Sequence, residues 1–279
     1  MGIASIDRIE AGLGDLRRTA AFVQGRVLFR PRPDDLYVAT YPRSGTTWMQ
    51  FLLHQLARGD QPFRHINDVC PWFERSLAVG SMTAEDLERL PSPRIFKTHL
   101  LPMWLPEGGR CVYIERGPGD VALSYFRLYR DYLGFAGTFD DFLERFVAGR
   151  VQYGSWWSHV AAWRALAETP RVLCIRYEAL RADPTAELTR VAQFGGLPTE
   201  PERIAAAVEG ASLSRMKELE GRFDHASALL HERGIAPRSF IRQGKVGAAH
   251  QELSPQQRER LAAGQQTPRR PPWLPAFLH

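Results

Sequence analysis

The sequence predicts an α/β fold in which a central parallel sheet is flanked by helices within a single domain. Four short apolar segments rich in β-formers alternate with longer helical patterns. Because these segments lack strict polar alternation, we expect strands that are buried on both faces, as in parallel sheets. No repeat, low-complexity run or change of composition marks a linker. The expected strands are 35–41, 93–99, 110–116 and 171–177.

Helical patterns fill the intervals between the expected strands. Several begin with proline or with acidic residues in the first turn, which favour a helix N-terminus. The expected helices are 47–57, 81–90, 118–132, 139–148, 155–168, 184–195 and 200–210. Regular patterning weakens over 220–246, and this loop, like the proline-rich tail, could be disordered or could fold over a ligand.

Charge, the length of apolar runs and cysteine spacing narrow the classes of protein to which this chain could belong. It has 279 residues, a formal net charge of +5 and a pI near 9.3, which suits an anionic ligand or simply a solvated surface. No apolar run approaches the roughly 18 residues that cross a bilayer, and the start lacks a signal-peptide pattern. The widely spaced Cys70, Cys111 and Cys174 indicate reduced core thiols. We therefore expect a cytoplasmic protein with no membrane span and no nucleic-acid partner.

The stretch YPRSGTTW follows the first expected strand and opens a helix. Such a turn aims several unpaired backbone N–H groups at one point, where a phosphate or sulfate binds. A Walker A loop would have an earlier glycine, and a lysine where this chain has Thr46, so an ordinary nucleotide kinase is disfavoured. The turn predicts an anion cradle from Arg43 to Thr47 with Trp48 as a stacking surface; a plain strand-to-helix turn is the alternative.

Polar residues also follow the next two strands. FKTHLLP places Lys97 and His99 after the second strand, where histidine can take a proton from a hydroxyl and lysine can neutralise negative charge. YIERGPGDVALSYFRLY places Arg116 after the third strand and Asp120 as a cap or first-turn acid of the next helix. Ser124 lies early in that helix, close enough to Arg116 to share an anion. A structural histidine, a surface arginine and a solvated serine are the simpler alternatives.

Taken together, the motifs resemble the soluble sulfotransferases. The motifs that match in order and spacing are YPRSGTTW, KTHL, R-x-x-x-D-V-A-x-S-Y, YGSWWSHVAAW, VLCIRYEALRADP, ASLSRMK and SFIRQGKVG. The resemblance implies a P-loop-like fold, the donor 3′-phosphoadenosine 5′-phosphosulfate (PAPS), and sulfuryl transfer to a hydroxyl or amine without an essential metal. It implies one sulfotransferase domain over 1–279, with a motif-bearing core at about 35–261 and a proline-rich tail at about 267–279.

The same resemblance implies roles for individual residues. The 5′-phosphosulfate would lie against Arg43, Ser44, Gly45, Thr46 and Thr47. The 3′-phosphate would meet Arg116, Ser124, Arg242 and the backbone of Gly244, while the adenine would lie near Trp48 and Tyr177. Ser212 and Gln243 complete the expected donor-binding set. His99 would be the general base, with Arg43, Lys97 and Ser124 completing the catalytic group.

Several positions depart from the family pattern. Arg43 stands where the family usually has lysine, which preserves charge but changes reach and removes a possible proton donor. Gln243 replaces an expected cation, and Ala211 and Leu213 replace a hydroxyl and an aromatic ring. These departures bear mainly on donor affinity. A P-loop-type kinase and a nucleotide-binding relative with weakened donor affinity are therefore the alternative functions.

The acceptor and the oligomeric state are the least determined features. An aromatic cleft beside a histidine base suits a phenol or alcohol group on a small, apolar molecule. The expected lining is Pro71, Trp72, Phe73, Trp104, Phe126, Tyr153 and the loop 220–238, although many of these aromatic residues could equally be core. Ser254 and Pro255 replace the family's short dimer signature, which makes a dimer by that route doubtful.

Overall fold

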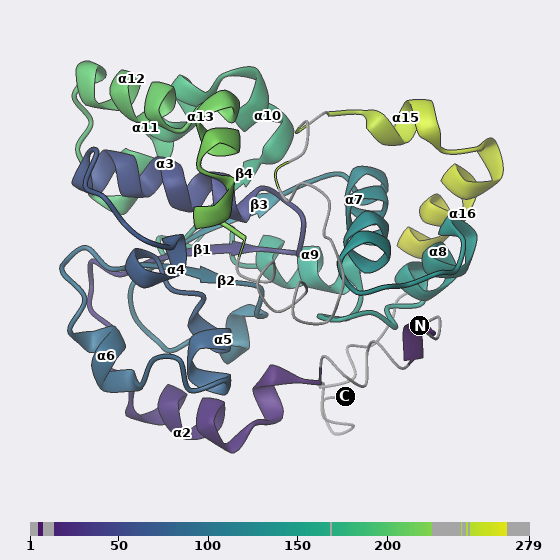
Figure 1. Cartoon of the computed structure of the whole chain (residues 1–279), viewed down its shortest axis with the longest axis horizontal. Helices are drawn as coiled ribbons and strands as arrows, with labels where there is room; N and C mark the ends of the chain where they lie inside the picture. The colour runs from purple at the N-terminus through teal and green to yellow at the C-terminus, as the bar shows by residue number, and fades with distance from the viewer. Residues whose placement is uncertain are drawn as a thin grey trace.

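Four parallel strands form the central sheet of the computed structural model (Figure 1). The structure describes residues 5–7, 14–167, 169–224, 241, 244 and 246–266. The strands are β1 (Leu36–Thr40), β2 (Ile95–Thr98), β3 (Arg110–Glu115) and β4 (Val172–Arg176). Their spatial order is β2-β1-β3-β4, with Leu36 opposite Ile95 and Arg110. All four expected strands are thus present, each shortened by one to three residues.

The sheet is buried on both faces because its side chains alternate between two cores. Tyr37 and Ala39 of β1 enter one hydrophobic cluster, while Leu36 and Val38 enter the other. Every residue of β1 is buried, which explains its continuous apolar pattern. The two clusters make this a three-layer arrangement of helices, sheet and helices.

Helices cover both faces of the sheet. Figure 1 shows α3 and α11 to α13 on one side and α2, α5 and α6 on the other. The helices are α2 (Ala20–Leu28), α3 (Thr46–Arg58), α4 (Ile66–Val69), α5 (Phe73–Ala78), α6 (Ala84–Glu88), α7 (Pro118–Asp131), α8 (Phe139–Val147), α9 (Trp156–Arg164), α10 (Tyr177–Ala182), α11 (Pro184–Gly195), α12 (Pro201–Gly210), α13 (Leu213–Glu218), α15 (Ala248–Glu252) and α16 (Pro255–Gln266). Short 3₁₀ turns lie at Leu16–Arg18, Pro102–Trp104 and Glu220–Arg222.

Helix ends differ from the sequence expectations where local capping decides them. Thr83 and Thr138 each form a capping box, with Asp86 and Asp141 respectively, so α6 begins at Ala84 rather than at 81, while α8 begins at Phe139 as expected. The helix expected over 155–168 ends at Arg164, and the one expected over 81–90 is only Ala84–Glu88. The patterns also missed α2, α4, α5, α10, α13, α15 and α16, because short or weakly amphipathic helices depend on tertiary packing.

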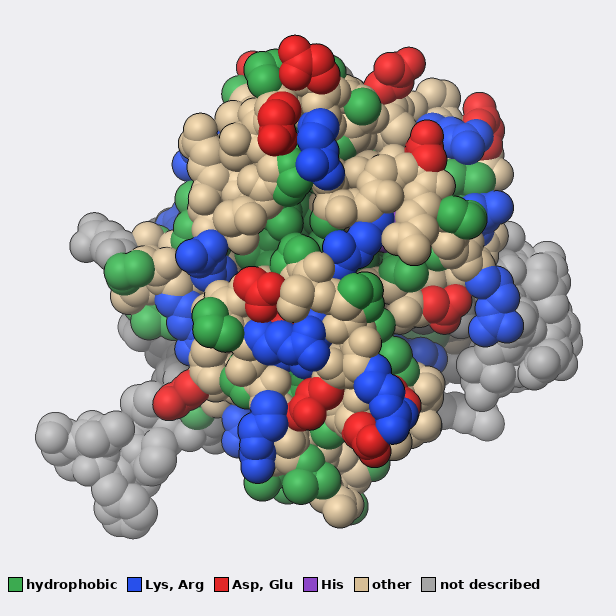
Figure 2. Space-filling view, turned by 90° about the vertical axis from the view of Figure 1, so that its left-hand side faces the viewer, with side chains coloured by type: hydrophobic (Ala, Val, Ile, Leu, Met, Phe, Trp, Pro, Cys, Tyr) green, Lys and Arg blue, Asp and Glu red, His purple; other side chains and the backbone are tan. Residues whose placement is uncertain are grey.

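The surface carries charges of both signs (Figure 2), and the three cysteines are not paired in disulfides. On the face drawn in Figure 2, Lys and Arg side chains are interspersed with Asp and Glu, as on a solvated surface. Within the described ranges, no helix is long and apolar enough to cross a membrane. Cys70 and Cys111 are buried free thiols, whereas Cys174 is partly exposed.

Candidate active site

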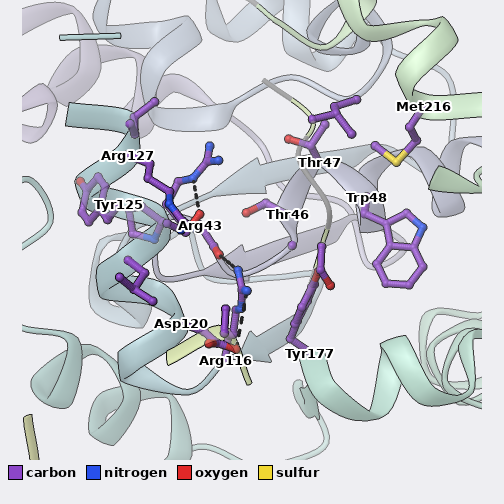
Figure 3. A pocket seen from close by; sticks show the side chains of 18 of the residues that line it. Arg43, Thr46, Thr47, Trp48, Arg116, Asp120, Tyr125, Arg127, Tyr177 and Met216 are labelled. Atoms are coloured by element: carbon purple, nitrogen blue, oxygen red, sulfur yellow. Dashed lines mark hydrogen bonds and ion pairs between the residues drawn. The ribbon is translucent and has the colours of Figure 1, made fainter. Parts of the chain in front are cut away.

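A cavity of about 940 Å³ opens at the carboxyl ends of the strands, where the predicted polar clusters meet (Figure 3). Of the predicted site residues, Arg43, Gly45, Thr46, Thr47, Trp48, Lys97, His99, Arg116, Ser124, Tyr177 and Gly244 line it. Ser44 and Ser212 are not part of the lining; the Ser212 hydroxyl instead accepts from the Arg215 N–H and caps α13. Arg242 and Gln243 lie outside the described residues.

The turn between β1 and α3 has backbone geometry that suits an anion cradle. Gly45 is the N-cap of α3 with φ +95°, a left-handed conformation that glycine adopts without strain. A Cβ at this position would lie 2.7 Å from the Tyr177 ring, so the backbone and the ring approach closely. The Ser44 hydroxyl is buried and has no hydrogen-bond partner among the described residues. The free N–H groups at the start of α3 therefore favour a bound anion.

Two arginines are linked through the backbone of this turn. The Arg43 Nε donates to Ser124 Oγ at 3.1 Å, and Arg116 Nη1 donates to the Arg43 carbonyl at 2.9 Å (Figure 3). Arg43 itself has φ +71°, and its side chain reaches Ser124 of α7. Arg116 also lies 3.8 Å from the buried Asp120 carboxylate. The two guanidinium groups thus face the same cavity while each is oriented by a polar neighbour.

Lys97 is a buried cation next to an aromatic ring. Its Nζ lies 4.0 Å from the centroid of the Trp72 ring, a cation–π contact. Burial lowers the pKa of Lys97 to about 7, although the Glu74 carboxylate opposes this shift and Arg43 and Arg75 add to it. A lysine with a pKa near neutrality responds to any negative charge that enters the cavity.

His99 follows β2 directly, and its imidazole is oriented by β1. Nδ1 lies 2.8 Å from the Thr40 carbonyl oxygen and 3.2 Å from Thr40 Oγ1. A carbonyl oxygen only accepts, so Nδ1 carries the proton and Nε2 carries the lone pair. The edges of Trp72 and Tyr153 flank the ring, each with its centroid 5.2 Å away. This geometry makes Nε2 of His99 a candidate proton acceptor.

The opposite end of the cavity has the features of a site for a flat ring. Trp48 Nε1 donates to the Ala211 carbonyl at 3.0 Å, which fixes the indole. The Tyr177 ring meets Trp48 edge-on. The Arg116 guanidinium lies over the Tyr177 ring, 4.5 Å from the centroid of that ring. Arg181 lies 5.3 Å above the Trp48 ring. Aromatic faces and guanidinium planes of this kind stack with nucleobases.

Two acidic residues of the site, Glu74 and Asp120, make contacts that were not predicted from the sequence. Glu74 of α5 accepts from the His99 backbone N–H at 2.8 Å and from the Tyr153 hydroxyl at 3.2 Å. Burial raises the pKa of Glu74, against hydrogen bonds from Trp72 and His99. Asp120, expected only as a cap or a first-turn acid of α7, accepts the backbone N–H groups of Gly247 and Ala249. Neither contact has a local sequence signal, because the partners are distant along the chain.

The aromatic lining differs from the expected one. Trp72 and Tyr153 line the cavity, and Leu128, Tyr132 and Gln152 join them. The expectation was wrong for Pro71, Phe73, Trp104 and Phe126, which are not among the lining residues. Of the expected loop 220–238, Glu220 lines the cavity, and 225–238 lie outside the described residues. Phe73 packs into the aromatic core beside Phe29, Tyr37 and Phe96. Phe126 packs on Phe135, Phe139 and Phe142. Trp104 lies beneath the guanidinium groups of Arg17 and Arg26.

Curated proteins with similar sequences are sulfotransferases. Rat sulfotransferase 1A1 is 32% identical over 247 residues, which are 84% of this chain and 84% of the rat protein. Human sulfotransferase 1C2 is 31% identical over 249 residues, covering 84% of this chain and 82% of the human protein.

Solved structures and a family model agree with these relatives. Mouse sulfotransferase SULT7A1, whose crystal structure is complexed with PAP (3′-phosphoadenosine 5′-phosphate), is 28% identical in sequence to this chain. The two structures have a TM-score of 0.68 over 88% of this chain and 86% of the mouse chain. Retinol dehydratase shares the fold at 24% identity, with a TM-score of 0.69 over 91% of this chain and 88% of its own. The model of the sulfotransferase domain matches residues 33–267. This chain therefore belongs to the sulfotransferase family.

Proposed function

We propose that this protein transfers a sulfuryl group from PAPS to a hydroxyl group of a small, largely apolar acceptor, with His99 as the general base. The observation that carries the proposal is the position of His99. Its Nδ1–H is engaged by the Thr40 carbonyl, and its ring lines the same cavity as Lys97 and the anion cradle. A base, two cations and an anion site in one cavity are what sulfuryl transfer to a hydroxyl requires.

The residues that are present fit the donor. The buried Ser44 hydroxyl without a partner and the glycine backbone at position 45 suit a negatively charged group in the cradle. Arg116 and Ser124 would bind the 3′-phosphate, and Trp48 and Tyr177 would flank the adenine. PAPS supplies the sulfuryl group; the protein supplies position and charge.

Arg43 and Lys97 stabilise different charges during the transfer. Arg43 stays protonated at any physiological pH, so it stabilises negative charge on the leaving phosphate without donating a proton. Lys97 faces the reaction centre from β2 and neutralises charge on the sulfuryl oxygens. His99 accepts the hydroxyl proton at Nε2 as the acceptor oxygen attacks. Sulfuryl transfer is similar to phosphoryl transfer in depending on in-line geometry and charge neutralisation.

The acceptor side of the cavity favours an aromatic or lipophilic hydroxyl compound. Trp72 and Tyr153 flank His99, and Leu128 and Tyr132 add apolar surface to the same cavity. The Tyr132 hydroxyl donates to Asp224 at 3.2 Å, which gives its polar end a partner within the protein. A phenol ring would be held by these side chains with its oxygen directed at the base. We also propose a cytoplasmic protein with one domain over 1–279.

Radiolabelled PAPS incubated with a panel of phenols, alcohols and amines tests this function. We expect transfer to phenols or alcohols, together with thermal stabilisation by PAP, 3′-phosphoadenosine 5′-phosphate. Absence of both transfer and PAP binding would overturn the proposal. Preferential stabilisation by Mg-ATP would point to a kinase, and PAP binding without any transfer would point to a non-catalytic relative.

A further inference from the structure

Helix α9 donates two side-chain hydrogen bonds into the backbone that carries His99. His159 Nε2 lies 3.1 Å from the His99 carbonyl oxygen, and Trp163 Nε1 donates to the Leu100 carbonyl at 3.2 Å. The two donors are four residues apart, so they lie on one face of α9 and reach consecutive carbonyls of the segment that follows β2. We call this pair of hydrogen bonds the carbonyl clamp.

The protons of the carbonyl clamp are assigned by its partners. A carbonyl oxygen only accepts, so His159 donates from Nε2, and its Nδ1 then accepts from the Tyr113 hydroxyl at 3.0 Å. Burial lowers the pKa of His159 to about 4, so the ring stays neutral near pH 7. Tyr113 also stacks on Trp163, with centroids 5.2 Å apart and planes 8° from parallel. Tyr113 of β3 thus supports both donors.

The other polar groups of the segment are held from different directions. The His99 N–H donates to Glu74 of α5 at 2.8 Å, and the Leu100 N–H donates to Thr98 Oγ1 at 3.1 Å. The His99 ring itself is held by Thr40 of β1. Backbone N–H, backbone C=O and imidazole are therefore each bonded to a different element, which leaves His99 little freedom to move.

We propose that His159 and Trp163 are positioning residues that fix the backbone of the general base. The inference rests on the proposed function in that it takes His99 to be the base. Neither side chain lines the cavity, and both are buried, so direct contact with donor or acceptor is not their role. A displacement of about 1 Å at a reacting group can lower a rate by roughly 100-fold, which is the effect that such positioning prevents.

His159→Gln and His159→Asn form a matched pair that tests the carbonyl clamp. Both place an uncharged amide at a buried position, but only glutamine extends to where Nε2 donates to the His99 carbonyl; asparagine reaches only toward Tyr113. With PAPS and a phenol, we expect His159→Asn to lower kcat by roughly 10- to 100-fold. We expect His159→Gln to remain within about threefold of the wild type, with the Kd for PAP within about twofold in both variants. Equal kcat values for the two variants would overturn the proposal.

Trp163→Phe and Trp156→Phe provide a second pair on the same helix. Both remove an indole N–H, but that of Trp156 is buried without a hydrogen-bond partner among the described residues. We expect Trp163→Phe to lower kcat more than Trp156→Phe at matched thermal stability. Losses of kcat that simply follow the fall in Tm would show a structural role only.

Hydrogen exchange of the segment 95–104 separates failure of this inference from failure of the proposed function. We expect faster exchange there in His159→Asn than in His159→Gln, whether or not the wild type transfers sulfuryl groups. If the wild type is inactive while this difference is present, the carbonyl clamp stands and the proposed function fails. Equal exchange in the two variants would remove the clamp regardless of activity.

Discussion

The imidazole Nδ1 of His99 lies 2.8 Å from the carbonyl oxygen of Thr40, so the last residue of β1 sets the tautomer of a histidine that follows β2. The two strands are neighbours in register, with Ala39 opposite Thr98. Their carboxyl ends therefore bring the histidine and the turn after β1 into one site. His99 and the turn after β1 are both supported by this pair of strands.

Replacing His99 by alanine removes the proposed base while leaving the cradle in place. We expect His99→Ala to lower kcat by roughly 10²- to 10⁴-fold, the contribution of a positioned general base. The Kd for PAP should stay within about twofold, because the donor-binding residues are untouched. Transfer assays and calorimetry check the two parts. Near-normal turnover would mean that another group accepts the proton.

Arg43 variants test whether charge or guanidinium geometry matters in the cradle. The Arg43 Nε donates to Ser124 Oγ at 3.1 Å. Arg43→Ala loses this charged contact, and we expect kcat to fall roughly 10- to 100-fold, equivalent to a charged hydrogen bond. Arg43→Lys keeps the charge and should stay within about tenfold of the wild type. Arg64→Ala is the control, because its side chain is 93% exposed. A fall in Arg43→Lys as large as that in Arg43→Ala would assign the effect to the guanidinium fork.

The proposed 3′-phosphate site is tested by comparing two nucleotides. We expect Arg116→Ala to weaken PAP binding by about 1.5–3 kcal/mol and adenosine 5′-phosphate binding much less. Arg116 lies 3.8 Å from the buried Asp120, so the variant also loses stability. The ratio of the two affinities, measured by calorimetry, is insensitive to that general loss. An unchanged ratio would show that Arg116 does not bind the 3′-phosphate.

Burial of Lys97 should make the stability of the protein depend on pH. Burial lowers its pKa to about 7, whereas an unfolded lysine titrates near 10.4. Between these values the unfolded chain binds more protons than the folded one, so the free energy of unfolding rises with pH by at most about 1.4 kcal/mol per unit. Urea unfolding at pH 7 and pH 9 measures this contribution. We expect a smaller rise in Lys97→Met than in the wild type; equal rises would contradict the shift.

Alanine variants of Gly45 and Gly80 distinguish the effect of backbone strain from the effect of a close contact with a neighbouring side chain. Both have positive φ, +95° and +68°, but only Gly45 has a neighbour where a Cβ would stand, 2.7 Å from the Tyr177 ring. We expect Gly80→Ala to lower stability by about 1–2 kcal/mol with the Kd for PAP unchanged. Gly45→Ala should lower stability more and weaken PAP binding at least about tenfold, since the cradle must shift. Equal PAP affinities in the two variants would place the anion elsewhere.

Local sequence signals were sufficient for the strands and for the residues that follow them. The turn YPRSGTTW, the pair Lys97 and His99, and Arg116 with Ser124 were all predicted, and the structure brings them into one cavity. They could be predicted because parallel strands deliver their carboxyl ends to one edge of a sheet. The short helix α5 was not predicted, and with it the approach of Glu74 to His99 was missed. The expected acceptor aromatics were partly wrong because burial in a core and exposure in a cleft have the same sequence pattern.

What the sequence by itself determined is the parallel α/β architecture and the chemical groups at its carboxyl edge, because both depend on periodicity, turn residues and short spacings. Only the tertiary structure decided how those groups are held. Thr40, Glu74 and His159 reach His99 from three elements that lie 25 to 60 residues away along the chain. Such contacts arise when distant elements pack around one buried segment, and each buried polar group must then find its partner in whichever element arrives.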